Sequence, residues 1–157
     1  PQWLIEDILE EETLIGLIGS SGSGKSFLAI DMACSIASGM PFHDRATTLG
    51  TVLYVASEGK RGLTTRVEAW CQKHRINSEN LDLHISQQKI SMHDNNAVRD
   101  VLNEANLIGN VRLIIIDTLA RSFGGHNENS TQDMNHFISN CDRLKAEHGI
   151  GGSWAVT

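Results

Sequence analysis

The chain has 157 residues, of which 40% are hydrophobic and 20% are charged, and its formal net charge is −6 at pH 7. This composition is ordinary for a globular protein, and the length suits one domain with a substantial core. The acidic balance excludes a surface that binds polyanions in general, so any contact with nucleic acid has to be local. The sequence shows neither an apolar run near the ~20 residues of a membrane span nor a signal-peptide pattern, so we expect no membrane partner and a cytoplasmic location.

Three widely separated cysteines, Cys34, Cys71 and Cys141, have no C-x-x-C spacing. This pattern favours buried or free thiols in a reducing compartment over zinc ligands or disulfides. The seven histidines likewise form no ligand pair on one face of a predicted helix. The sequence therefore predicts neither a zinc site nor a disulfide framework.

The first predicted elements frame a glycine-rich loop. A short apolar segment at 3–5 is expected to pack beside a strand predicted over 14–18. The next eight residues, at 19–26, read Gly-Ser-Ser-Gly-Ser-Gly-Lys-Ser and fit the pattern G-x-x-x-x-G-K-[ST]. A helix is predicted over 27–38, because apolar residues recur there at helical spacing: Leu28, Ala29, Met32, Ala33, Ile36 and Ala37. The loop thus lies between a strand and a helix, as a phosphate-binding loop must.

The spacing of this loop suits a phosphate chain. Its glycines allow backbone N–H groups to turn toward an anion, and the following helix directs its positive dipole end there. Lys25 is expected to reach the β- and γ-phosphates as a catalytic cation, and the Ser26 hydroxyl is expected to ligate Mg²⁺. A plain turn is the alternative, but the motif and its flanks favour a nucleoside-triphosphate site. The residues expected to bind nucleotide are Ser21, Gly22, Ser23, Gly24, Lys25, Ser26 and Phe27.

A carboxylate follows the next predicted strand, which covers 51–56. Ligands of open parallel sheets bind at the carboxyl ends of the strands, so Glu58 is predicted to face the same crevice as the phosphate loop. We expect Glu58 to be the catalytic general base that orients the attacking water. The alternative is a solvated loop glutamate.

A second acid ends the apolar run Val111–Asp117, which predicts a buried central strand. Combined with the upstream loop, this acid is typical of the Walker B position, and we expect Asp117 to hold Mg²⁺ during catalysis. Between the two acid-ending strands, helices are predicted at 61–75 and 97–107 and a weaker strand at 81–85. Three basic residues at the first of these helices are expected to be solvated charges: Lys60, Arg61 and Arg66.

The last third of the chain is more polar. Residues 124–130 are expected to form an exposed loop, either a contact for DNA or a neighbouring subunit or a plain connection, before a helix at 131–148. The tail at 150–157 offers only a brief apolar run where another central strand is expected. We therefore expect residues 1–157 to be a single core domain that is incomplete at its C-terminal end.

Alternating strands and helices predict an α/β fold, a three-layer αβα P-loop domain with a mostly parallel central sheet. Within it, the phosphate loop is followed in order by Tyr54–Glu58, Leu113–Arg121 and Gly124–Ser130. Together these segments resemble the RecA-like ATPases of the RepA hexameric helicase type, found on plasmids and phages. The resemblance covers nearly the whole chain, from Trp3 to about Gly149.

The resemblance implies a RecA-like ATPase with ATP and Mg²⁺ as cofactors. It implies a homo-oligomeric ring such as a hexamer, with ATP hydrolysed at subunit interfaces and single-stranded DNA as the track. It also implies Lys25 and Ser26 on phosphates and Mg²⁺, Glu58 as catalytic base and Asp117 as the Walker B acid. The sensor histidine and arginine finger of that family have no counterpart after Gly149.

Two other functions fit the same motifs. One is a RecA-like ATPase that serves recombination, repair or regulation without unwinding DNA. The other is a nucleotide-gated assembly protein that binds ATP and hydrolyses little of it. Stimulation of ATP turnover by single-stranded DNA separates a motor from the assembly protein, and strand displacement separates a helicase from the other ATPases.

Overall fold

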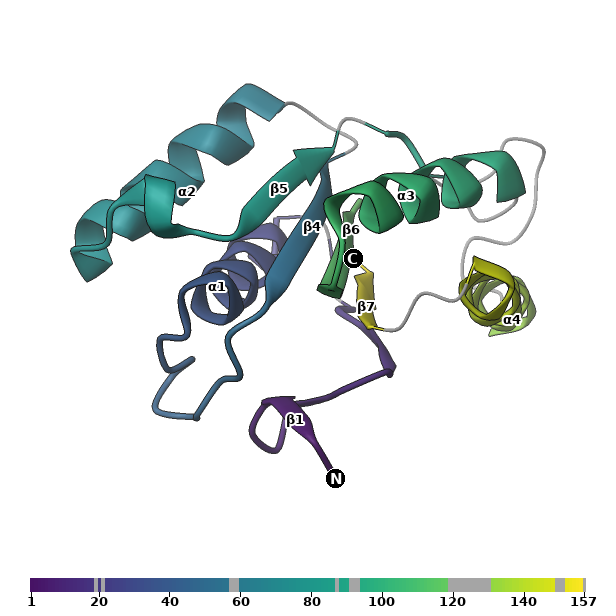
Figure 1. Ribbon diagram of the computed structural model, residues 1–157, viewed down its shortest axis with the longest axis horizontal. Helices are drawn as coiled ribbons and strands as arrows, with labels where there is room; N and C mark the ends of the chain where they lie inside the picture. The colour runs from purple at the N-terminus through teal and green to yellow at the C-terminus, as the bar shows by residue number, and fades with distance from the viewer. Residues whose placement is uncertain are drawn as a thin grey trace.

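The computed structural model has a parallel β-sheet at its centre (Figure 1). It describes residues 1–18, 20, 22–56, 60–86, 88–90, 94–118, 131–148 and 152–156. In spatial order the sheet consists of β3 (Leu14–Gly16), β7 (Ser153–Val156), β6 (Val111–Asp117), β4 (Thr51–Ala56) and β5 (Leu83–Ser86). All its pairings are parallel, so the carboxyl ends of these strands lie along one edge.

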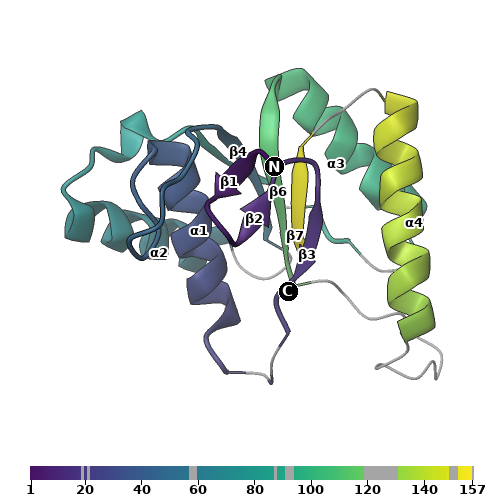
Figure 2. The same ribbon diagram turned by 90° about the horizontal axis from the view of Figure 1, so that it is seen from below.

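Helices cover both faces of this sheet (Figure 2). On one face lie α1 (Lys25–Ser38) and α2 (Lys60–His74), and on the other lie α3 (Asn95–Ile108) and α4 (Thr131–His148). A short 3₁₀ helix, η1 (Ser78–Asn80), follows α2. This is the predicted α/β fold with three layers. Among the described helices, none combines the length and apolar character that crossing a bilayer requires.

The core divides into two clusters because successive strand residues face opposite sides of the sheet. On β4, Tyr54 belongs to the cluster under α1 and α2, whereas Leu53 and Val55 belong to the cluster under α3 and α4. On β6, Ile115 and Ile116 divide in the same way. Burial on both faces explains why these two strands are continuous apolar runs in the sequence. The cysteines are free and buried, as predicted: Cys34, Cys71 and Cys141.

The N-terminal segment forms a small hairpin of β1 (Trp3–Ile5) and β2 (Leu9–Glu10). Leu4, Ile5 and Leu9 are fully buried in the cluster that contains α1. The sequence predicted the packing of this segment but not its antiparallel partner. Because the hairpin buries apolar side chains, it extends the core on the α1 side of the sheet.

Two predictions at the start of the domain need correction. The first strand ends at Gly16, and Ile18, which was predicted to lie in it, is 97% exposed. The helix that follows begins at Lys25 instead of Phe27, and Leu28 in its first turn is 40% exposed instead of packed on the sheet. The strand therefore ends two residues earlier, and the helix begins two residues earlier, than the sequence predicted.

The strand that the sequence left missing near the C-terminus is present as β7. Although it has four residues, it pairs in parallel with β3 on one side and β6 on the other. Pairing on both sides satisfies backbone groups that a short run could not satisfy alone. The central strand that the sequence led us to expect at 150–157 is therefore present, although its apolar run is brief.

Candidate nucleotide site

The loop between β3 and α1 depends on two glycines with left-handed backbone. Gly22 has a φ of 77° and Gly24 has a φ of 92°, values that side-chain-bearing residues rarely adopt. A Cβ atom at either position would meet nothing within 4 Å, so the requirement for glycine is conformational. Gly24 is also the N-cap of α1, and among the described residues no side chain caps this helix and no acid lies in its first turn. The positive dipole end of α1 is therefore available to an anion at the loop.

The ammonium of Lys25 lies back across the same loop. Its Nζ atom donates a hydrogen bond to the Ser20 carbonyl oxygen at 2.9 Å. The Ser23 amide donates to the same carbonyl group at 3.2 Å. This carbonyl oxygen holds the cation above the start of α1, where a phosphate oxygen would be an equivalent acceptor. Gly19 and Ser21 lie outside the described residues.

Ser26 and Asp117 meet although 91 positions separate them in the chain. The Ser26 hydroxyl, in the first turn of α1, donates to Asp117 Oδ1 at 3.1 Å. Asp117 ends β6 at the carboxyl edge of the sheet, where α1 begins. The two residues predicted as Mg²⁺ ligands are thus brought together by the fold.

Tyr54 holds the other oxygen of the Asp117 carboxylate. The phenol is 1% exposed and donates to Asp117 Oδ2 at 2.5 Å. Burial raises the pKa of Tyr54, and the hydrogen bond to Asp117 raises it further, so the phenol keeps its proton and stays a donor. The register explains the contact: Tyr54 pairs with Ile115, and Asp117 lies two residues further on the same face. Thr118 also donates to Oδ1, at 3.1 Å.

These oxygens form a donor set that fits Mg²⁺. The ion prefers oxygen ligands and is commonly held by one or two carboxylates together with substrate phosphates. The described residues contain no group of three or more His, Cys, Asp or Glu side chains that could hold a metal by themselves. A hydroxyl and one oriented carboxylate beside a phosphate loop match that sparse protein contribution. Ser26 and Asp117 are the residues that would hold the ion.

A cavity of about 230 Å³ opens at this point. Small-molecule pockets usually measure roughly 300–1,000 Å³, so this space suits a terminal phosphate and its metal better than a whole nucleotide. Its walls come from the α1 start, the ends of β4 and β6, and the first turns of α2. The lining residues are Ser26, Ile30, Tyr54, Ala56, Gly62, Leu63, Arg66, Asp117 and Thr118.

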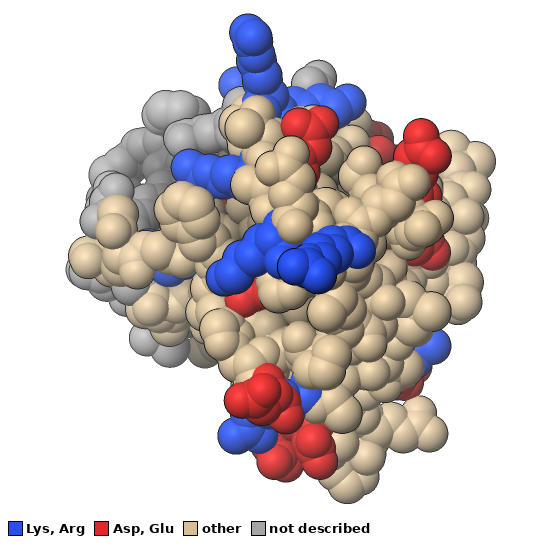
Figure 3. Space-filling view, turned by 90° about the vertical axis from the view of Figure 1, so that its left-hand side faces the viewer, with Lys and Arg blue, Asp and Glu red and all other residues tan. Residues whose placement is uncertain are grey.

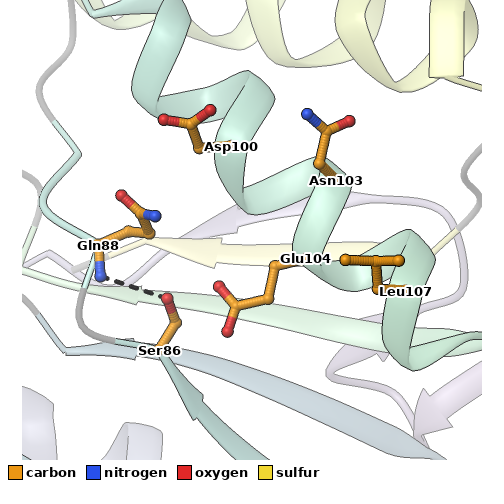
Figure 4. Close-up of a pocket in the computed structure, with 6 residues that line it drawn as sticks. All are labelled: Ser86, Gln88, Asp100, Asn103, Glu104 and Leu107. Atoms are coloured by element: carbon orange, nitrogen blue, oxygen red, sulfur yellow. Dashed lines mark hydrogen bonds between the residues drawn. The ribbon is translucent and has the colours of Figure 1, made fainter.

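A larger and more open cavity of about 560 Å³ lies between the end of β5 and α3 (Figure 4). Two carboxylates, Asp100 and Glu104, stand on its helical wall, and no lysine or arginine is among its described lining residues. Such a wall repels a triphosphate. The remaining lining residues are Ser86, Gln88, Asn103 and Leu107. The larger cavity is therefore not the nucleotide site.

Some of the predicted site residues lie together in the structure, and others lie outside the described residues. It brings Lys25, Ser26 and Asp117 to one edge of the sheet. Phe27 is 63% exposed in the first turn of α1. Glu58 lies outside the described residues, as do Arg121 and the segment 124–130.

Two residues at the site escaped the sequence analysis. Tyr54 was treated only as part of a buried strand, although the single tyrosine of the chain in such a strand needs a partner for its hydroxyl. Arg66 was treated as a solvated charge, yet it lines the cavity beside Asp117. Arg66 is exposed, but it lies beside Leu63 and Val67 of the buried stripe of α2, and this position at the border of the stripe is the signal that could have found it.

Fold and site together define a P-loop nucleotide-binding domain of the α/β class. The sequence matches the AAA domain family over residues 1–156, and the chain therefore belongs to that family. Comparison with curated proteins finds no match. Among solved structures, the chain is similar to the RadB recombinase, with a TM-score of 0.58 and 16% sequence identity. The match covers 94% of this chain and 61% of the RadB chain, so this chain spans less than two thirds of that protein.

At 16% sequence identity, the structural similarity to RadB shows a shared fold and does not show a shared function. It supports the predicted RecA-like arrangement, with helices on both faces of a parallel sheet. The family match supports an ATP-binding domain. The comparisons do not confirm the resemblance to RepA-type helicases.

Proposed function

We propose that this chain is the Mg²⁺-dependent, ATP-hydrolysing motor domain of a DNA helicase of the RepA type. The observation that carries the ATPase part is the hydrogen bond of 3.1 Å between Ser26 and Asp117. It joins the end of the phosphate-loop motif to the acid of the buried strand, the pairing that phosphoryl transfer requires. The helicase part depends on the resemblance of the motifs in the sequence.

The chain's own residues would position and neutralise the triphosphate. Lys25, now bonded to the Ser20 carbonyl oxygen, would donate instead to the β- and γ-phosphates. The amides at the start of α1 would donate to the same phosphates. Ser26 and Asp117 would hold Mg²⁺, which would supply positive charge to neutralise the phosphates. Tyr54 keeps the Asp117 carboxylate oriented by donating to its second oxygen.

Glu58 is our proposed general base. Strand β4 ends at Ala56, whose register partner on β6 is Asp117. One residue of the chain, Ser57, separates Ala56 from Glu58. Because Ala56 and Asp117 are register partners, β4 and β6 end at the same edge of the sheet. A carboxylate there would orient water for attack on the γ-phosphate.

Single-stranded DNA and further copies of this chain are the proposed partners, in a cytoplasmic ring such as a hexamer. Because the formal charge is −6, DNA contacts must be concentrated. Cations are unevenly distributed: Lys and Arg side chains gather across the middle of the face on which α2 lies (Figure 3). Helix α2 carries four lysines and arginines and one acid, Glu68.

Turnover and unwinding by the purified protein test this proposal. We expect ATP hydrolysis that requires Mg²⁺, increases with single-stranded DNA and is abolished by Lys25→Ala, while Glu58→Gln binds ATP but does not hydrolyse it. Hydrolysis without strand displacement would favour a recombination or regulatory ATPase. Assembly upon ATP binding with negligible turnover would favour the nucleotide-gated assembly protein. Normal hydrolysis by the Lys25→Ala variant would refute the site itself.

A further inference from the structure

Helix α2, which carries the exposed residue Arg66, packs against α1 beside the candidate site. Its neighbours on the helix, Leu63, Val67 and Trp70, are buried in the cluster that contains α1. The Trp70 indole Nε1–H donates to Asp31 Oδ1 on α1 at 2.8 Å, which fixes α2 against that helix. The backbone of Arg66 therefore has a defined place next to the start of α1.

The guanidinium of Arg66 is placed by an aromatic ring. Its Cζ atom lies 4.5 Å from the centre of the Phe27 ring, in the first turn of α1 directly after Ser26. Within the described part of the chain, Arg66 makes neither a hydrogen bond nor an ion pair, so its five N–H donors have no protein acceptor there. A cation over an exposed ring is only weakly attracted. The guanidinium therefore contacts the Phe27 ring and is bonded to no acid among the described residues.

Arg66 also faces the residues that would hold the metal. It lines the cavity of about 230 Å³ together with Ser26, Tyr54 and Asp117, and it is the only cation among the described lining residues. A planar guanidinium binds phosphate oxygens through two parallel hydrogen bonds, which a weak ring contact cannot match.

We propose that Arg66 binds the terminal phosphate of the nucleotide from within the same chain, and that Phe27 holds the guanidinium ready when that phosphate is absent. Since ADP lacks the γ-phosphate, Arg66 would make the site distinguish ATP from ADP. This inference rests on the proposed ATP site and deepens it by naming a residue that reads the γ-phosphate. The Arg66 side chain is exposed, as the sequence predicted, and it also lines the cavity at the site.

Nucleotide affinities of matched variants test the proposal. Calorimetry with Mg²⁺ would give the Kd for ADP and for a non-hydrolysable ATP analogue in wild type, Arg66→Ala, Arg66→Lys and Arg61→Ala. Because hydrogen bonds to charged groups are lost, Arg66→Ala should weaken binding of the analogue by about 10- to 100-fold. ADP binding should change by less than about twofold, the scale of a neutral surface substitution. Arg66→Lys should recover part of the loss, and Arg61→Ala, on the same helix, should behave as wild type.

Equal weakening of both nucleotides, or an unchanged ratio of their affinities, would overturn the assignment of Arg66. Absence of nucleotide binding by wild type, or full binding by Lys25→Ala, would instead overturn the proposed function. Thermal unfolding of each variant ensures that only folded protein is compared.

The role of Phe27 has its own test in a double-mutant cycle. Phe27→Leu keeps an apolar side chain but removes the ring face, so analogue binding should weaken by a smaller factor than in Arg66→Ala. In the double variant the loss should equal that of Arg66→Ala alone, because the ring acts only through the guanidinium. Losses that multiply would contradict this coupling and leave Phe27 without the proposed role.

Discussion

Two cavities open at the edges of one sheet, and they differ in the charged side chains that line them. The cavity under α1 and α2 measures about 230 Å³ and combines a hydroxyl, an oriented carboxylate and a guanidinium. The cavity beside α3 measures about 560 Å³ and presents Asp100 and Glu104 without a lysine or arginine among its described lining residues. The smaller cavity adjoins a glycine loop at a helix start, whereas the larger one lies beside the middle and end of α3.

The difference shows that donor arrangement, not size, marks the site. A triphosphate needs convergent cations and N–H groups, and a metal bound with it needs a few fixed oxygens. Strand alternation sends Tyr54 and Asp117 to the α1 side of the sheet, where the phosphate loop lies. The α3 side receives apolar strand residues and an acidic helix face.

The largest effect is expected from Asp117→Asn. Loss of the carboxylate charge that would hold Mg²⁺ should reduce ATP turnover by about 10³-fold, comparable to removal of a principal electrostatic group at an active site. In the other cavity, Asp100→Asn with Glu104→Gln should change turnover by no more than about twofold. Steady-state turnover measures both. A large loss in the double variant alone would reverse the assignment of the two cavities.

Tyr54→Phe should have the next largest effect. The substitution preserves the ring and removes the hydroxyl that orients Asp117, so the apparent affinity for Mg²⁺ should fall by about 10- to 100-fold. A matched control is Thr51→Val at the other end of β4, which removes the hydroxyl that bonds Asp82. Turnover as a function of Mg²⁺ concentration should be unchanged in the control. An identical Mg²⁺ dependence in Tyr54→Phe and wild type would show that Asp117 needs no such support.

Glycine-to-alanine substitutions in the phosphate loop and in α2 should change the free energy of unfolding in opposite directions. Gly24→Ala forces a left-handed backbone on alanine and should lower the free energy of unfolding by about 1–2 kcal/mol. Gly62→Ala in α2 has open space and no left-handed backbone, so it should raise the free energy of unfolding by roughly 0.5–1 kcal/mol. Chemical denaturation gives both values. Equal signs for the two variants would contradict the backbone described for the loop.

The smallest effect concerns pH. Burial raises the pKa of Cys34 and of Cys141 from 9.0 to about 12. Below pH 9 both thiols are protonated in folded and unfolded chains and add no pH dependence. Between pH 9 and about 12 the unfolded chain loses protons that the folded chain keeps, so the free energy of unfolding should fall. Replacing both cysteines by alanine should flatten this fall in a denaturant titration, and an unchanged slope would exclude the two thiols as its source.

Motif and periodicity predicted much of this molecule because they report local requirements. The left-handed glycines, the helix after them and the buried run ending in Asp117 are properties of short segments, and the sequence analysis located each one. The contacts that complete the site depend on strand order and register, which one sequence does not display. Tyr54 reaches Asp117 only because β4 and β6 are neighbours in that register. Arg66 reaches Phe27 because α2 packs on α1, where Trp70 donates a hydrogen bond to Asp31.

Strand β7 likewise depends on pairing that one sequence does not display. The four residues of β7 are too few to stand out as a pattern, but two parallel partners stabilise them in the middle of the sheet. Long-range pairing here overrides a weak local signal.

The central claim is that the phosphate loop and the end of β6 hold one metal–nucleotide complex on the α1 side of the sheet. Paramagnetic resonance of Mn²⁺, used in place of Mg²⁺ with a non-hydrolysable ATP analogue, tests this claim most directly by counting tightly bound ions. We predict about one ion per wild-type chain, its loss in both Ser26→Ala and Asp117→Asn, and its retention in the Asp100→Asn, Glu104→Gln variant. Undiminished Mn²⁺ binding in Ser26→Ala and Asp117→Asn would contradict the account.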